Sequence, residues 1–267
     1  MPPRLVASDL DGTLLRSDGT VDERTRQAIA TAEAAGATVV FCTARPHRWL
    51  KPLAEYLFPT RPHHGLAVCA NGAVLWDVHT ESVIEAAPLE PAVARRLVAL
   101  LEAELPGGTW AVERTGGFAH EPSYVPRWPV PADTLIDAVD ALIDEPAVKL
   151  LLRHGRLSAD DLLTRARAVG GHLAEFSHSS MNDALLEISA TGVSKASGLA
   201  RLCRRLGVEP DEVIAFGDMP NDLPMLAWAG RAVAVANAHP EVIAAADEVT
   251  ASNDEAGVAQ VLERLFG

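Results

Sequence analysis

The chain has 267 residues, of which 48% are hydrophobic and 22% are charged, and these fractions are typical of a folded, water-soluble protein. A net charge of −13 argues against non-specific nucleic-acid binding and against docking on anionic lipid, because both need a basic surface. The N-terminal residues lack the pattern of a signal peptide, and no apolar run reaches the length of a membrane span. We therefore expect a cytoplasmic protein, a monomer or homodimer, that binds neither nucleic acid nor a membrane.

The three cysteines give no sign of a metal site or a redox pair. Cys42, Cys69 and Cys203 lie far apart in the sequence, and the first two fall within apolar runs. Their spacing matches neither a C-x-x-C motif nor a zinc-ligand pattern. We interpret them as reduced thiols in the protein interior.

The first third of the chain alternates apolar runs with one helix. The runs cover residues 4–8, 38–45 and 66–72, and each ends in or just before polar residues. Thr20 followed by Glu23 fits a capping box that opens a helix through Ala35, and Gly36 stands at its C-terminal end. Nearly continuous apolar strands of this kind predict a parallel sheet with helices on both faces.

The last third repeats this rhythm. We expect helices at 195–206, 221–229, 239–246 and 255–266, and strands at 213–218 and 231–238. In open parallel sheets, ligands bind just beyond the carboxyl ends of the strands. The polar residues that end these runs therefore point to one site.

The middle of the chain, residues 83–188, has a different pattern. We expect helices at 90–104, 134–143 and 158–169, and strands at 109–113, 148–154, 172–176 and 184–188. The prediction is an α/β fold in which residues 1–82 and 189–267 form a parallel-sheet core. Residues 83–188 form an inserted α+β domain.

The strongest chemical signal is the acidic pair that follows the first apolar run. Asp9 and Asp11 project to the same side of an extended chain, and Gly12 permits a sharp turn before Thr13. Two carboxylates this close do not both ionise readily without a cation, so the pair predicts either a metal ion or a shared proton. The spacing does not fit a calcium loop of the EF-hand type, and a plain polar turn is the alternative.

Other polar residues end or begin elements at the same edge of the predicted sheet. Thr43 can hydrogen-bond a phosphoryl oxygen, and Lys195 begins a helix whose N-terminal amides favour an anion, although a lone lysine is usually a surface residue. Asp218 is well placed as a metal ligand. Asn221 and Asp222 either support the site or cap the helix that follows.

These segments, in this order, resemble the four motifs of the haloacid dehalogenase superfamily. The inserted domain resembles the large α/β cap of the Cof-type sugar-phosphatase branch, and Asn71-Gly72 and the segment around Asn253 also resemble that branch. The resemblance covers essentially the whole chain and implies a Rossmann-like core. Ala44 and Ala196 replace glycines that are usual in the family, and neither change removes a functional side chain. The matching motif residues are Asp9, Asp11, Gly12 and Thr13; Thr43; Lys195; and Gly217, Asp218, Asn221 and Asp222.

The resemblance implies a Mg²⁺-dependent phosphatase that acts on a small phosphorylated metabolite, a sugar phosphate first of all. Asp9 would attack phosphorus to form an aspartyl-phosphate, and Asp11 would serve as acid and then as base. Mg²⁺ would bind Asp9, the main-chain carbonyl of Asp11 and Asp218. Phosphate would be bound by Thr43, Lys195 and Asn221, with Gly12, Thr13, Arg45 and Asp222 in support.

Some assignments stay open at this point. Arg45 either assists phosphate binding or pairs with a nearby carboxylate. The segment 178–182 is a candidate specificity loop with Ser179, Ser180 and Asn182, and Asn71 is a further candidate for substrate contact. A surface turn is the alternative for that loop.

Three other functions remain to be separated from phosphatase activity. A phosphotransferase or phosphomutase of the same superfamily would share the first motif. A dehalogenase would have no need of Asp11, because a departing halide needs no proton. A non-catalytic sensor of a phosphometabolite would have no need of a nucleophile beside an acid.

Overall fold

The computed structural model describes residues 2–50, 65–127, 129–178 and 183–267, and the chain forms two compact units. The first unit is Met1–Glu85 with Ser194–Gly267, and the second is Ala86–Val193. The sequence placed these boundaries after residues 82 and 188. In the structure both boundaries lie a few residues later. Strand β5 (Ser82–Ala86) belongs to the sheet of the first unit, and strand β11 (Leu185–Ala190) continues past residue 188 in the sheet of the second.

The first unit is built on an eight-stranded sheet in the order β14-β13-β12-β1-β2-β3-β4-β5. The strands from β14 to β3 pair in parallel, and β4 is antiparallel to β3. Besides β5, the strands are β1 (Leu5–Ser8), β2 (Thr38–Cys42), β3 (Leu66–Cys69), β4 (Val74–Asp77), β12 (Val213–Gly217), β13 (Arg231–Ala234) and β14 (Glu248–Val249). Every residue of β1, β2 and β12 is buried, which explains their continuous apolar sequences.

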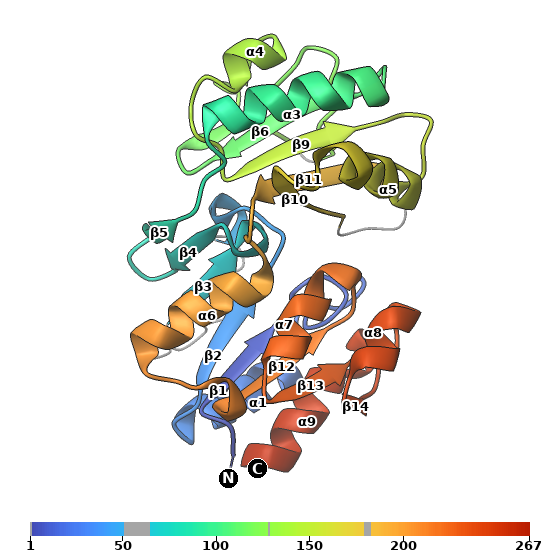
Figure 1. The fold of residues 1–267 in the computed structure, drawn as a ribbon. Coiled ribbons are helices and arrows are strands. Elements are labelled where there is room, and N and C mark those ends of the chain that lie inside the picture. Colours follow the sequence, from blue (N-terminus) through green and yellow to red (C-terminus); the bar gives the residue numbers. More distant parts are fainter. Residues whose placement is uncertain (1, 51–64, 128, 179–182) are drawn as a thin grey trace. The chain divides into compact units, whose positions relative to one another are not determined.

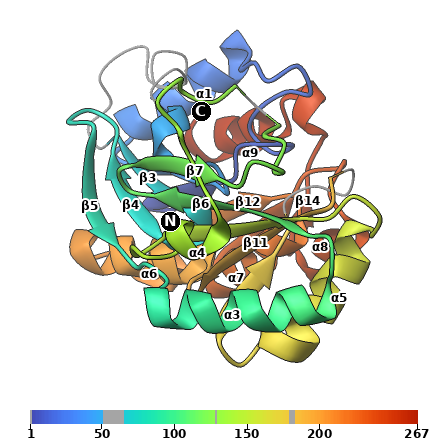
Figure 2. The same cartoon turned by 90° about the horizontal axis from the view of Figure 1, so that it is seen from above.

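Helices cover both faces of this sheet. Helices α1 (Glu23–Ala34) and α9 (Gly257–Phe266) pack together on one face, and α6 (Lys195–Leu206) and α7 (Leu223–Trp228) pack together on the other (Figures 1 and 2). The shorter helical segments are η1 (His47–Trp49), η2 (Ala70–Gly72), η3 (Pro210–Glu212), η4 (Pro220–Asp222), α8 (Pro240–Ala245) and η5 (Asn253–Glu255). None of the helices in the described part of the chain is long and apolar enough to cross a lipid bilayer.

Several element ends differ from the sequence prediction for local reasons. Helix α1 is capped by the side chain of Asp22, which accepts from the Thr25 N–H, so the predicted capping box at Thr20 is wrong. The helix predicted from Asn221 begins as the 3₁₀ turn η4 and becomes α-helical only at Leu223. Helix α9 starts at Gly257, because Ala256 adopts a left-handed conformation with φ 57°.

The second unit contains a six-stranded sheet in the order β10-β11-β9-β6-β7-β8. Besides β11, its elements are α3 (Pro91–Glu104), β6 (Thr109–Arg114), β7 (Gly117–His120), β8 (Leu135–Ile136), α4 (Val139–Leu142), β9 (Lys149–Arg153), α5 (Ala159–Gly170) and β10 (Ala174–Ser177). Helices α3 and α5 lie side by side on one face of this sheet (Figure 2). A single apolar core joins them to it through side chains such as Leu97, Leu150 and Leu162.

The helix predicted at 134–143 is confirmed only at α4 (Val139–Leu142), its first part is strand β8, and strand β7 was not predicted. Leu135 and Ile136 pair in parallel with β7, and Asp137 accepts from the N–H of Ala138 just before the short helix α4. Strand β7 was missed because two glycines, at 116 and 117, precede a run of only three apolar or aromatic residues.

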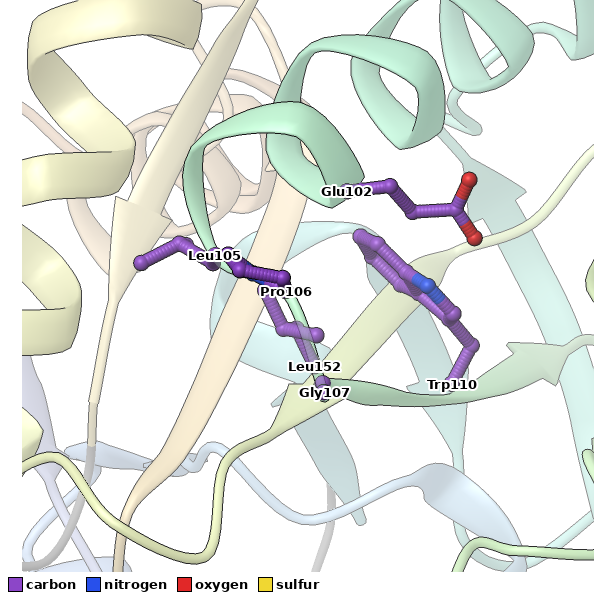
Figure 3. A pocket seen from close by; sticks show the side chains of 7 residues that line it. Glu102, Leu105, Pro106, Gly107, Trp110 and Leu152 are labelled. Carbon is purple, nitrogen blue, oxygen red and sulfur yellow. The ribbon is translucent and has the colours of Figure 1, made fainter.

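A shallow pocket of about 270 Å³ lies at the C-terminal end of α3, beside β6 and β9 (Figure 3). Its lining consists of Glu102, Leu105, Pro106, Gly107, Gly108, Trp110 and Leu152. Among these described residues, Glu102 is the one ionisable side chain. The pocket therefore offers no cationic group for a phosphate.

Gly72 marks the closest approach between η2 and the start of α6. Its φ is +101°, and a Cβ atom there would lie 1.9 Å from the carbonyl oxygen of Ser194. Gly36 is a matched control, because its φ is +94° but a Cβ atom would meet nothing within 4 Å. The two glycines therefore separate the cost of a left-handed backbone from the cost of a steric clash.

We expect Gly36→Ala to lower the free energy of unfolding by about 1–2 kcal/mol, the cost of a left-handed alanine. Gly72→Ala should cost about 1–3 kcal/mol more, because the added methyl group overpacks the contact with Ser194. Urea unfolding of both variants measures the difference. Equal losses would show that the close approach is not rigid.

Candidate active site

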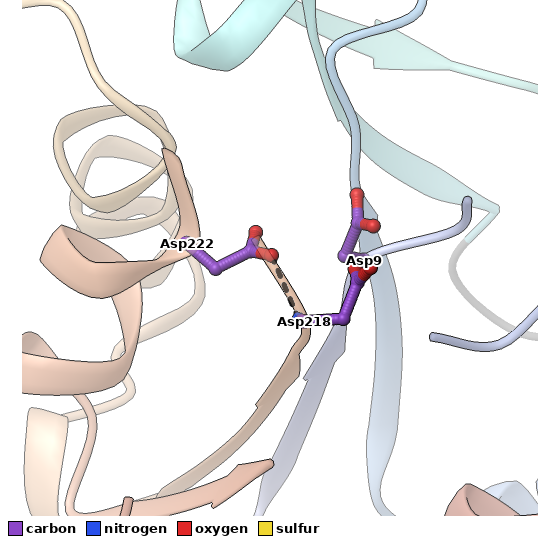
Figure 4. A group of neighbouring side chains, drawn as sticks. All are labelled: Asp9, Asp218 and Asp222. Carbon is purple, nitrogen blue, oxygen red and sulfur yellow. Dashed lines mark hydrogen bonds between the residues drawn. The ribbon is translucent and has the colours of Figure 1, made fainter. Parts of the chain in front are cut away.

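The carboxyl ends of β1 and β12 bring acidic side chains together at one edge of the sheet. Asp9 follows β1, and its N–H donates to the carbonyl oxygen of Phe216 in β12 at 3.0 Å. Asp218 follows β12, and Asp222 lies one turn later. One carboxylate oxygen from each of the three residues lies within 4.8 Å of the others, and all three side chains are buried (Figure 4).

Lys195 lies inside this acidic cluster rather than on the surface. Its Nζ is 2.6 Å from Asp9 Oδ1 and 2.6 Å from Asp222 Oδ1, and the side chain is 1% exposed. Ser194 caps α6 by accepting from the Ser197 N–H, which fixes the first turn of the helix on which Lys195 stands. Burial opposes the charge on Lys195, but attraction to Asp222 and Asp9 outweighs it, so the pKa of this lysine is raised.

Asp222 uses both carboxylate oxygens within the protein. Its Oδ1 accepts from Lys195, and its Oδ2 accepts from the N–H groups of Asp218 and Met219, each at 3.0 Å. The side chain is fully buried. Asp222 therefore fixes the turn after β12 and the ammonium group of Lys195, but its side chain does not cap the following helix α7.

Asp218 is held by the turn that follows Asp11. Thr13 Oγ1 donates to Asp218 Oδ1 at 2.8 Å. Gly12 has φ +81°, and a Cβ atom there would lie 2.4 Å from Asp218 Oδ2, so this position requires glycine. Burial, followed by the charge of Asp222, raises the pKa of Asp218 to about 6.

The cluster has the composition of a site for a hard divalent cation. Three buried carboxylates surround one ammonium group, and burial raises the pKa of Asp9 well above its usual value although Lys195 opposes this. Lys195 binds one oxygen of Asp9, and Thr13 binds one oxygen of Asp218. The Asp9 and Asp218 side chains also contact each other, and a cation held by both would replace that contact. Oxygen ligands of this kind fit Mg²⁺. Asp222 is not available, because both of its oxygens are engaged.

Asp11 lies apart from the buried cluster. Its carboxylate is 54% exposed and forms a two-point ion pair with Arg45, with Arg45 Nε 2.7 Å from Oδ2 and Nη2 2.5 Å from Oδ1. Two roles were left open for Arg45, and the structure shows it as the ion-pair partner of a carboxylate.

The other predicted phosphate and substrate residues lie in the same unit. Thr43 is fully buried, and its Oγ1 accepts from the Arg45 N–H at 3.0 Å. Asn221 Nδ2 donates to Asn71 Oδ1 at 3.2 Å, while Asn221 Oδ1 is buried without a hydrogen-bond partner among the described residues. The candidate specificity residues Ser179, Ser180 and Asn182 lie outside the described residues.

Two asparagines support the turn after β1, and sequence reasoning gave neither of them this role. Asn237 Nδ2 donates to the carbonyl oxygen of Gly12 at 2.7 Å, and its Oδ1 accepts from the Asn253 N–H at 2.9 Å. Asn253 Nδ2 in turn donates to the carbonyl oxygen of Leu15 at 2.9 Å. Asn237 was assigned to the interior of a strand, but β13 ends at Ala234. The rule that polar residues beyond strand ends line the site would have identified it.

Comparisons with known proteins agree with this geometry. The model of a family described as haloacid dehalogenase-like hydrolases matches residues 6–262. The pyridoxal phosphate phosphatase YbhA of Escherichia coli is 30% identical over 276 residues, which cover 98% of each chain. The 5-amino-6-(5-phospho-D-ribitylamino)uracil phosphatase YitU of Bacillus subtilis is 30% identical and covers 99% of this chain and 98% of its own.

Solved structures share the whole fold, including the inserted unit. A haloacid dehalogenase-like hydrolase from Bacteroides thetaiotaomicron is 27% identical, has a TM-score of 0.78, and covers 99% of this chain and 100% of its own. The sugar phosphatase BT4131 of haloacid dehalogenase subclass IIB has a TM-score of 0.79 at 20% identity and covers 98% of each chain. At that identity the likeness concerns the fold alone.

Removing the ammonium group from the cluster should be costly. We expect Lys195→Met to lower the free energy of unfolding by about 3–5 kcal/mol, because Asp9 and Asp222 would remain buried without their cation. Arg24 is the control, because its ion pair with Glu263 is exposed and Arg24→Met should have little effect on the free energy of unfolding. Urea unfolding in the presence of EDTA measures both. Similar losses in the two variants would contradict this description of the cluster.

Proposed function

This chain belongs to the haloacid dehalogenase-like hydrolase family, and we propose that it is a Mg²⁺-dependent phosphatase that acts through an aspartyl-phosphate on Asp9. The family predicted from the four motifs is confirmed. The α/β fold with an inserted unit is confirmed as well, and the chain shares it with the sugar phosphatase BT4131. Membership of this family, together with relatives that are phosphatases, makes the chain a phosphoric monoester hydrolase. The metal, the covalent intermediate and the substrate class are our proposal.

One observation carries the proposal, namely the contact of Asp9 with Lys195 inside a buried acidic cluster. A carboxylate attacks phosphorus only when it is ionised, yet burial raises the pKa of Asp9. The ammonium group at 2.6 Å offsets part of that effect. A divalent cation held by Asp9, Asp218 and the main chain at Asp11 would supply the rest and would reduce repulsion between the nucleophile and an anionic substrate. A protein that only binds a phosphometabolite has no use for this arrangement.

The chain's own residues then divide the reaction into two displacements. An oxygen of Asp9 attacks phosphorus, the ester bond to the leaving oxygen breaks, and that oxygen takes a proton from Asp11. Water next attacks phosphorus and gives its proton to Asp11. The bond between phosphorus and Asp9 breaks, so phosphate is released and the Asp9 carboxylate is restored. Lys195 and Thr43 would hold the other phosphoryl oxygens, with Asp222 fixing Lys195.

Asn221 is the remaining phosphate ligand in the proposal. Its Oδ1 is buried without a partner among the described residues, and its Nδ2 is bound to Asn71. A phosphoryl oxygen would need the amide nitrogen, because an oxygen acceptor cannot bind a second acceptor. That nitrogen carries two hydrogens and gives one of them to Asn71, so we propose that Asn221 donates the other to the substrate.

The proposed substrate is a small phosphomonoester, with a sugar phosphate as the first candidate. The named relatives act on pyridoxal phosphate and on a phosphoribityl-aminouracil, and the subclass IIB structure is that of a sugar phosphatase. What these compounds share is a phosphate ester on a compact polar group. We propose that the inserted unit, Ala86–Val193, selects among such groups.

The test is hydrolysis of p-nitrophenyl phosphate and a panel of sugar phosphates, pyridoxal phosphate and flavin mononucleotide, with Mg²⁺ and with EDTA. We expect activity that needs Mg²⁺ and that falls more than about a thousandfold in Asp9→Asn, because the nucleophile is lost while its shape is kept. Asp144→Asn is the control, since that aspartate lies on the surface of the second unit beside Arg95.

Two results would count against the proposal. Activity that persists in Asp9→Asn would exclude the covalent route. Phosphate transfer to an added sugar in preference to water would make the protein a phosphotransferase, and product analysis with and without the acceptor separates the two.

A further inference from the structure

The ion pair between Arg45 and Asp11 is the strongest feature near the site that the reaction scheme leaves unexplained. Asp11 has to act on a proton twice, yet its carboxylate is 54% exposed and is not one of the three buried carboxylates of the cluster. Arg45 contacts both of its oxygens. An exposed aspartate held at two points has far less rotational freedom than one that is held by solvent alone.

Arg45 is itself fixed by the loop that follows β2. Its N–H donates to Thr43 Oγ1 at 3.0 Å, and its carbonyl oxygen accepts from the Ala70 N–H at 2.9 Å. The side chain is 23% exposed. Burial opposes the charge on the guanidinium, but the hydrogen bonds and charge of Asp11 outweigh it, so the pKa of Arg45 is raised and the group stays cationic. The loop thus presents a rigid, planar cation to Asp11.

We propose that Arg45 is a positioning residue for the second displacement, in which it holds the Asp11 carboxylate as the proton acceptor for the attacking water. This inference rests on the proposed function. A planar guanidinium binds a carboxylate through two parallel hydrogen bonds and so fixes both oxygens, which a lysine cannot do. The paired carboxylate has the form that Asp11 takes once its proton has gone to the leaving group.

The proton balance of the cycle agrees with this role. In the first displacement Asp11 gives its proton to the leaving oxygen and becomes a carboxylate. In the second, the water oxygen bonds to phosphorus, the bond from phosphorus to Asp9 breaks, and its electron pair returns to Asp9. The proton from water goes to Asp11, which is then ready for the next substrate. Arg45 would hold the Asp11 carboxylate in place after it has lost its proton to the leaving oxygen and before it takes a proton from water.

The alternative is that Arg45 binds the substrate phosphate directly. The two roles affect different kinetic quantities when the substrate is p-nitrophenyl phosphate, whose leaving group departs without a proton. The value of kcat/KM then covers binding and the first displacement. The decay rate of the phosphoenzyme covers the second displacement alone.

The experiment compares Arg45→Met and Arg45→Lys with the wild type, using rapid quench and intact-protein mass to follow the phosphoenzyme. In Arg45→Met we expect phosphoenzyme decay to slow by about 10–100-fold, a substantial part of what a positioned base contributes. A burst of p-nitrophenolate should appear, and kcat/KM should stay within about threefold of the wild-type value. Arg45→Lys keeps the charge without the planar fork and should show a smaller slowing.

A matched control is available in the same unit. Arg24 also pairs with a carboxylate at two points, with Nε 2.8 Å from Glu263 Oε1 and Nη2 2.6 Å from Oε2, but it joins α1 to α9 at the surface. Arg24→Met should leave both kinetic quantities at their wild-type values.

Two outcomes would overturn the inference. If kcat/KM falls as much as kcat and no phosphoenzyme accumulates, Arg45 binds the substrate instead. If decay in Arg45→Met and Arg45→Lys matches the wild-type rate, the ion pair has no part in the reaction. Asp9→Asn separates either result from failure of the proposed function, because activity that survives that substitution would contradict the covalent route whatever Arg45 does.

Discussion

The buried contact of Lys195 with Asp9 and Asp222 is the interaction on which the rest of the site depends. An ammonium group that is 1% exposed is tolerated only because two carboxylates lie at 2.6 Å, and those carboxylates are tolerated in turn because of the ammonium group. The arrangement still holds more negative than positive charge. In the proposed function, that imbalance would favour a bound cation, and the bound cation would in turn favour a phosphate.

The fold keeps these groups in place with contacts from distant parts of the chain. Parallel pairing of β1 with β12 puts Asp9 beside Asp218, and the capped start of α6 places Lys195 between Asp9 and Asp222. The turn after β1 is held from the other side, where Asn237 binds the carbonyl of Gly12 and Asn253 binds Asn237. Each contact is polar and directional, so the position of Asp9 is set by several hydrogen bonds rather than by packing alone.

The chemistry-bearing motifs could be predicted from the sequence because each follows a buried strand and the carboxyl ends of parallel strands meet at one edge. The burial of Lys195 could not, because a lysine at the start of a helix looks like a surface residue until its partners are known. The role of Asn237 was not predicted, because β13 ends four residues earlier than its apolar pattern suggested. In the inserted unit, β7 forms by pairing with β6, and β8 forms by pairing with β7. Short strands that depend on such pairing are hard to predict from local sequence.

The most direct test of the central claim is to identify the residue that carries the phosphoryl group. Borohydride added during turnover of p-nitrophenyl phosphate reduces an aspartyl-phosphate to homoserine, and peptide mass analysis locates the change. The account predicts homoserine at position 9 in the Mg²⁺-loaded enzyme and an unmodified chain in EDTA. Modification at another aspartate, or none during rapid turnover, would contradict it.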